Sequence, residues 1–141
     1  MAKRKQKSKL LKLMKENERS TYVTTEEDCM LWFRILNREI FNNQLSPLSE
    51  IHIGWKRGTY GYYTKITDTS DPDYLYTKLS MNKKYRSKQF FVEVLAHELI
   101  HHYQAIYNQP LGHGPTFLIW RDKLNRKGIN LTRVYVADEA K

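Results

Sequence analysis

The sequence predicts an α+β fold in which a small antiparallel-type sheet packs on a central helix with flanking helices. Residues 87–108 contain no Gly or Pro and place apolar side chains along one helical face, which predicts the central helix. Residues 51–55 alternate between apolar and polar side chains, as a half-buried strand does. Residues 60–66 and 74–81 are rich in Tyr, Thr, Ile and Leu and predict two neighbouring antiparallel strands. A chain of 141 residues has the usual size of one core.

The flanking elements follow from cap and breaker residues. Thr24 and Glu27 have the spacing of a capping box, and the apolar positions that follow recur at helical intervals, so we expect a first helix over about 25–41. Pro115 is a good first residue for a last helix, which should end near Gly128. Residues 129–136 are strand-like.

The net charge of +9 is concentrated near the N-terminus. The first 15 residues contain no acidic side chain and seven basic ones: Lys3, Arg4, Lys5, Lys7, Lys9, Lys12 and Lys15. We therefore expect a basic, flexible tail over residues 1–20 and a folded domain over residues 21–141. Such a tail either contacts nucleic-acid phosphates by counterion release or acts as a solubilising arm.

Apolar runs and cysteine content indicate the compartment and the kind of metal site. No run approaches the length of a membrane span, and the basic N-terminus lacks the continuous apolar stretch of a secretion signal, so we expect a cytoplasmic or nuclear-type protein with no membrane partner. The single Cys29 cannot form an intramolecular disulfide or a Cys-rich zinc ribbon, and its apolar neighbours predict a buried thiol. Any metal site must therefore consist of His and carboxylate side chains.

The central helix contains the sequence His97-Glu98-Leu99-Ile100-His101, which is the HExxH pattern. Two His side chains four residues apart lie about one helical turn from each other, so both can bind one zinc ion. Glu98 is turned about 100° from His97 and can reach a water on the open side of the metal as a general base. The pattern thus predicts a hydrolytic metal site.

A catalytic zinc ion needs a third protein ligand. The position six residues beyond His101 is Tyr107, which disfavours one common HExxH class, and Asp122 and Glu139 are acidic candidates further along the chain. His113 is favoured because it lies between two glycines, where the backbone can approach a metal closely. His102 projects with the apolar face and His52 lies between two isoleucines, so both are expected to be structural.

These motifs resemble the SprT-like metallopeptidase domain, the family that includes the Spartan proteases acting on DNA–protein crosslinks. The resemblance covers about residues 25–128. It rests on Phe41-Asn42 with Leu45, Ile51 to Trp55 with Lys56 and Arg57, Gly61, Lys78-Leu79-Ser80, the His97 to His101 pattern, and Gly112-His113-Gly114-Pro115 with Phe117.

The resemblance implies a minimal zincin-like peptidase with one Zn²⁺ per chain, held by His97, His101 and His113, and with Glu98 as the catalytic base. It also implies a protein substrate close to DNA. Family members commonly carry a further Cys-rich DNA-binding module, and no Cys follows Cys29 here. The expected nucleic-acid contacts are therefore basic residues: Lys3, Arg4, Lys5, Lys7, Lys9, Lys83, Lys84 and Arg86. The alternative is a non-catalytic, zinc-stabilised module that binds nucleic acid or a partner.

Overall fold

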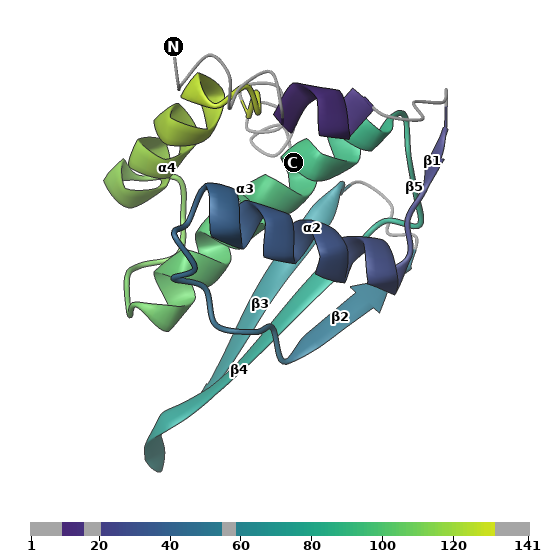
Figure 1. Cartoon of the computed structure of the whole chain (residues 1–141). Coiled ribbons are helices and arrows are strands. Elements are labelled where there is room, and N and C mark those ends of the chain that lie inside the picture. The colour runs from purple at the N-terminus through teal and green to yellow at the C-terminus, as the bar shows by residue number, and fades with distance from the viewer. Residues whose placement is uncertain (1–9, 16–20, 55–58, 132–141) are drawn as a thin grey trace.

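The computed structural model describes residues 10–15, 21–54 and 59–131 and has a mixed α+β fold (Figure 1). Helix α2 packs beside strand β2, whereas α3 packs against β3 and β4. Side chains on the opposite face of the sheet, such as His52 and Tyr62, are exposed. In chain order the elements are β1 (Tyr22–Val23), α2 (Glu26–Glu39), β2 (Glu50–Ile53), β3 (Gly61–Asp68), β4 (Asp71–Met81), β5 (Lys84–Tyr85), α3 (Lys88–Ile106) and α4 (Pro115–Arg126).

Strand β4 is the middle strand of a three-stranded sheet with the order β2-β4-β3. Leu79 of β4 is paired with Tyr63 of antiparallel β3 and with Ile51 of parallel β2. The antiparallel prediction is therefore confirmed for β3 and β4 and wrong for β2. Alternating side chains report which face of a strand is buried, but they do not report the direction of its neighbour. Here β4 lies between β2 and β3, antiparallel to β3 and parallel to β2.

Strands β3 and β4 form a long hairpin that extends away from the helices (Figure 1). The predicted strands 60–66 and 74–81 are confirmed, and the loop between them is shorter than expected. Asp68 makes the turn because its Oδ1 accepts hydrogen bonds from the backbone N–H and the hydroxyl of Ser70, at 2.9 and 2.7 Å. The tip carries three exposed carboxylates, Asp68, Asp71 and Asp73.

The N-cap of helix α2 is Thr25, and not Thr24 as the sequence had predicted. The Oγ1 of Thr25 accepts the N–H of Asp28 at 3.1 Å, so Thr25 is the cap. The capping role predicted for Thr24 is wrong because its N–H bonds to the carbonyl of Lys83 at 2.8 Å, which keeps it extended beside β5. The span expected for the helix is confirmed to within two residues at its C-terminal end. Cys29 is fully buried as predicted, and this burial raises the pKa of its thiol to about 12.

The two ends of the described chain differ from expectation. Residues 10–15 are helical, and the side chains of Leu10 and Met14 are buried in the core. These six positions therefore belong to the packed structure and not to a flexible tail. At the other end Ile129 and Leu131 are buried but are not in a strand, and the remainder of the strand expected over 129–136 lies outside the described residues.

Helix α3 is the central helix, as predicted. The Oγ of Ser87 caps it by accepting the N–H of Phe90 at 3.0 Å. Buried residues lie on almost every side of α3, because the sheet, α2 and α4 all pack against it. Several polar side chains on this helix, such as those of Glu93, Glu98 and Gln104, therefore lie inside the protein. Within the described residues, no helix is both long and apolar enough to cross a membrane.

Candidate metal centre

Helix α3 presents His97 and His101 one turn apart on the side that faces Phe117 of α4. The centroids of the two imidazole rings are 5.2 Å apart. His97 is only 1% exposed, whereas His101 is partly exposed. The pair therefore lies at the edge of the core, where one side remains accessible.

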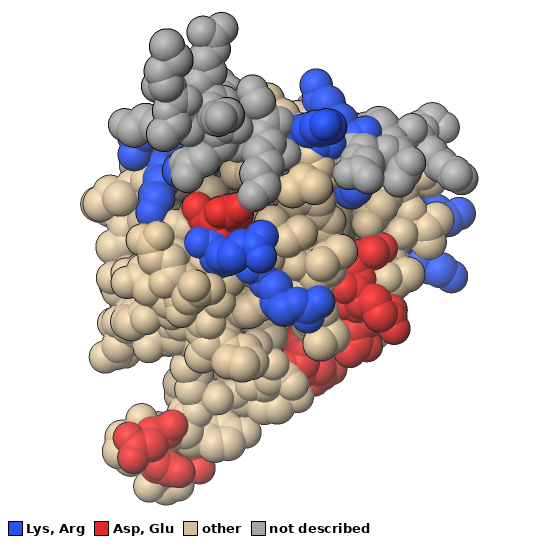
Figure 2. All heavy atoms as spheres, viewed as in Figure 1, with Lys and Arg blue, Asp and Glu red and all other residues tan. Residues whose placement is uncertain are grey.

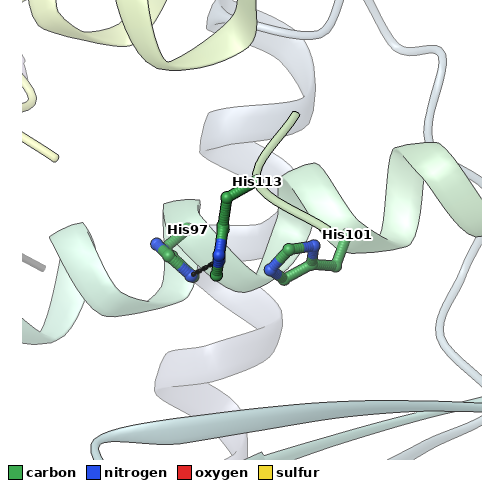
Figure 3. Close-up of side chains that lie close together, drawn as sticks. All are labelled: His97, His101 and His113. Carbon is green, nitrogen blue, oxygen red and sulfur yellow. Dashed lines mark hydrogen bonds between the residues drawn. The ribbon is translucent and has the colours of Figure 1, made fainter. Parts of the chain in front are cut away.

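The loop between α3 and α4 brings His113 to the same place. The chain reverses after α3 with Asn108 at φ 54° and Gly112 at φ 152°, backbone angles that L side chains rarely adopt. His113 Nε2 consequently lies 3.3 Å from His97 Nε2, and the ring centroid of His113 is 5.1 Å from that of each other histidine. Figure 3 shows the three imidazoles turned toward one another, two from the helix and one from the loop.

The three imidazoles fit the requirements of one metal ion. One ligand nitrogen from each histidine lies within 4.8 Å of the other two. Two nitrogens that bind a tetrahedral zinc ion at about 2.0–2.1 Å are about 3.3 Å apart, which agrees with the separation of the Nε2 atoms of His97 and His113. Among the described residues, the acidic alternative Asp122 is not part of this group of histidines. Its Oδ1 lies 3.4 Å from a guanidinium nitrogen of Arg121. The other alternative, Glu139, lies outside the described residues.

Glu98 follows His97 on α3 and is buried at the place where β3 meets α3. Its side chain is 5% exposed. A Cβ atom added to Gly61 would lie 3.3 Å from the Cγ of Glu98, so the strand backbone and the glutamate side chain are in close contact. Tyr85 is close as well: burial raises the pKa of its phenol above the usual range, and the charge of Glu98 adds to that rise. The carboxylate is thus held between helix and sheet.

The comparison with protein families agrees with this arrangement. The model of the SprT-like family matches residues 30–136, which is most of the chain. The chain belongs to the SprT-like family. This confirms the resemblance drawn from the HExxH pattern and the loop around His113. No curated protein matched the chain.

Phe117 forms the apolar wall of the metal centre in this SprT-like domain. Its side chain is fully buried. Its ring centroid lies 4.9 Å from that of His97, 5.4 Å from that of His101 and 4.7 Å from that of His113. One aromatic side chain therefore limits the rotation of all three candidate ligands.

Gln104 also contacts the centre, although the sequence did not indicate it. It is fully buried on α3, and its Oε1 lies 2.9 Å from the Nδ1 of His101. The same amide bonds to the backbone of Gly112 and to the hydroxyl of Thr116, on either side of His113. The available signal was an amide side chain three positions, or about one helical turn, after the candidate ligand His101.

The other two histidines of the SprT-like domain lie apart from the metal centre. His102 is fully buried and bonds to the hydroxyl of Tyr63 at 2.8 Å and to the carbonyl of Ser46 at 2.7 Å, as expected of a core histidine. Because a carbonyl only accepts, His102 Nε2 donates and Nδ1 accepts from Tyr63. Burial lowers the pKa of His102, so the ring is neutral. His52 is exposed on the opposite face of the sheet.

The predicted nucleic-acid contacts fall into two groups. Lys83, Lys84 and Arg86 are exposed just before α3, and the guanidinium of Arg86 lies 4.1 Å from the ring centroid of Phe90. The other five, Lys3, Arg4, Lys5, Lys7 and Lys9, lie outside the described residues. Figure 2 shows basic side chains on the part of the surface formed by the helices, and acidic ones both at the hairpin tip and in a larger area on the right of the view. Of the predicted contacts, Lys83, Lys84 and Arg86 thus lie beside the N-terminus of α3.

Proposed function

We propose that this SprT-like domain is a zincin-like, zinc-dependent endopeptidase that acts on DNA-associated proteins. The observation that carries the proposal is the convergence of His97, His101 and His113 within 4.8 Å, next to the buried carboxylate of Glu98. Membership of the SprT-like family supports it. The α+β fold supports it as well, since the helix with the HExxH pattern packs directly on the sheet.

Zinc suits these ligands better than the hard cations do. Imidazole nitrogens are good ligands for zinc, whereas calcium and magnesium prefer oxygen ligands. Three protein ligands are also the usual number at a catalytic zinc site, because the remaining position accepts a water or a substrate. When bound, zinc lowers the pKa of that water and polarises the carbonyl of a peptide bond.

Glu98 supplies the proton transfers. As a carboxylate it takes a proton from the attacking water, and it then donates that proton to the amine that leaves when the peptide bond breaks. Its position between α3 and the start of β3 keeps the carboxylate in one place. Because Glu98 is only 5% exposed, the low dielectric around its carboxylate strengthens its electrostatic interactions at the site.

A peptidase test uses one conservative substitution. Glu98→Gln keeps the shape of the side chain and removes the base, so zinc content should stay near one per chain while cleavage of an unfolded protein such as casein is lost. Glu93→Gln is the matched control, because Glu93 is equally buried on α3 and is not one of the grouped metal ligands. It should retain cleavage. Unchanged cleavage by Glu98→Gln would exclude Glu98 as the base.

The alternative function gives a different pattern in the same experiment. A non-catalytic module stabilised by zinc would bind zinc and DNA but would show no cleavage of any protein, with or without Glu98. Metal analysis, DNA binding and cleavage should therefore be measured on the same preparations.

DNA association needs its own test, and the structure shows which variant to avoid. Deleting residues 1–15 would remove the buried side chains of Leu10 and Met14 together with the tail charges. Lys83→Gln with Lys84→Gln neutralises two exposed residues instead. If both contact phosphates, the slope of log affinity against log salt should fall by about 1.4–1.8. An unchanged slope would remove this surface from the proposal, and the same test with Lys3, Arg4, Lys5, Lys7 and Lys9 replaced would then assess the tail.

A further inference from the structure

Gln104 links the two parts of the chain that supply the candidate metal ligands. Its amide makes four hydrogen bonds to three different groups: His101, the backbone of Gly112 and the side chain of Thr116. The side chain is fully buried, so water does not compete for these bonds.

The backbone of Gly112 determines which way the amide points. The carbonyl of Gly112 can only accept, and it lies 3.1 Å from Nε2 of Gln104. The N–H of Gly112 can only donate, and it lies 3.3 Å from Oε1. Both contacts require the same amide orientation, with Oε1 toward the N–H group and Nε2 toward the carbonyl.

This orientation determines the tautomer of His101. The Oε1 atom is an acceptor and lies 2.9 Å from the Nδ1 of His101, so Nδ1 must carry the proton. In a neutral ring the Nε2 of His101 is then unprotonated, and its lone pair is available to a metal. A hydrogen bond of this kind to the outer nitrogen of a ligand histidine also makes the inner nitrogen more basic.

The same amide holds the loop that carries His113. Gly112 lies immediately before His113, and Thr116, whose Oγ1 is 2.9 Å from Gln104 Nε2, lies three residues after it. Because Gly112 restricts the backbone less than any other residue would, the loop needs contacts from elsewhere to keep one conformation. Gln104 supplies them from α3.

We propose that Gln104 is the positioning residue of the metal centre, which sets the tautomer of His101 and the place of His113 at the same time. This inference rests on the metal site of the proposed function but not on peptide hydrolysis. It predicts that loss of the amide weakens metal binding in a protein that still folds.

The variants separate the two tasks of the amide. Gln104→Met keeps the length of the side chain and removes all four hydrogen bonds, so zinc affinity should fall about 10- to 100-fold. Gln104→Glu keeps the acceptor for His101 and loses the donor to the Gly112 carbonyl, so its zinc affinity should lie between those of Gln104→Met and the unmodified protein. Thr116→Val leaves the bond to His101 intact, and its affinity should fall less than about threefold.

Asn37 provides the matched control. Its side-chain amide joins α2 to the next loop through two bonds to the backbone of Leu45, each 3.0 Å long, far from the histidines in the sequence. Asn37→Leu should therefore destabilise the apo protein in the same manner as Gln104→Met, yet leave zinc affinity unchanged. Affinity is measured by competition with a chelating dye, cobalt absorption reports the ligand geometry, and urea unfolding reports stability.

The outcomes separate this inference from the peptidase proposal. Gln104→Met with zinc affinity within twofold of the unmodified protein would overturn the positioning role, and so would an equal loss of affinity in Asn37→Leu. If Gln104→Met does not fold, Gln104→Glu and Thr116→Val decide, because a Gln104→Glu affinity at or above the unmodified value would also overturn it. A domain that binds zinc but cleaves no protein would refute the peptidase and leave the role of Gln104 standing.

Discussion

Replacement of Gly61 by alanine should impair turnover without affecting metal binding. An added Cβ atom would lie 2.9 Å from the Cγ1 of Val94 and 3.3 Å from the Cγ of Glu98. Separations below 3.0 Å are not tolerated, and Val94 is only 1% exposed, so it has no room to rotate away. The start of β3 must therefore move away from α3. Overpacking of this kind destabilises a protein by about 1–3 kcal/mol.

The effect on catalysis follows from the second contact. The added Cβ crowds the Cγ of Glu98 at 3.3 Å, so the side chain of Glu98 must give way by a few tenths of an ångström, and misplacement of a catalytic group by about 1 Å can reduce a rate by about 100-fold. We therefore expect Gly61→Ala to lower kcat by about 10-fold. Zinc affinity should not change, because the atoms closest to this Cβ belong to Val94, Glu98 and Met81 and not to the histidines.

Gly54→Ala is the control for this substitution. A Cβ atom at Gly54 would lie 2.8 Å from the Nε2 of His52, an equally short distance, but His52 is exposed and its ring can swing into solvent. Gly54→Ala should consequently be nearly neutral in urea unfolding, zinc competition and casein cleavage. A Gly61→Ala protein with unaltered stability and turnover would refute the close packing of β3 on Glu98.

Three further predictions concern the core around the site. Phe117→Ala should lower the free energy of unfolding of the apo protein by about 3–5 kcal/mol, measured in urea, because the side chain is fully buried; a loss below about 1 kcal/mol would contradict its role as the wall. Tyr63→Phe removes the donor to the buried Nδ1 of His102 and should cost about 1–3 kcal/mol, whereas a neutral result would mean that water replaces the hydroxyl. The pKa of Cys29 is raised by burial from 9.0 to about 12, so the unfolded chain releases its thiol proton first as the pH rises. The protonated thiol therefore stabilises the fold fully below pH 9, and this stabilisation is lost between pH 9 and about 12. At pH 10 the free energy of unfolding should be lower by about 1.4 kcal/mol. Cys29→Ala should lack this part of the pH dependence.

The helices that carry the site could be predicted because each has an unambiguous local signal. A Gly- and Pro-free stretch with apolar spacing predicted α3, and Pro115 marked the start of α4. A separation of four residues brings His97 and His101 onto the same side only in a helix, so the helix and the pair of ligands could be predicted together. His113 needed the resemblance as well, because the path of a loop depends on backbone angles such as that of Gly112, which spacing does not reveal.

Other features depend on contacts between residues far apart in the sequence. The parallel pairing of β2 with β4 depends on the insertion of a whole strand, and β1 with β5 forms a separate two-stranded sheet too short to leave a pattern. Basic residues around Leu10 and Met14 made residues 10–15 look like part of a tail, although the two apolar side chains are buried. The role of Gln104 depends on three partners, of which Gly112 belongs to the loop after α3 and Thr116 to the start of α4.

The carboxylates at the tip of the β3–β4 hairpin concentrate negative charge at one end of the molecule. Asp68, Asp71 and Asp73 lie at one end of the molecule, and β5 with Lys84 lies near the other (Figure 1). A polyanion such as DNA repels these carboxylates, and the repulsion favours orientations of the domain in which the hairpin tip points away from the polyanion. If the domain associates with DNA as proposed, this repulsion favours an approach in which the hairpin points away from the DNA. Reversing the charge of the tip should then slow association in that orientation without altering a residue of the metal centre.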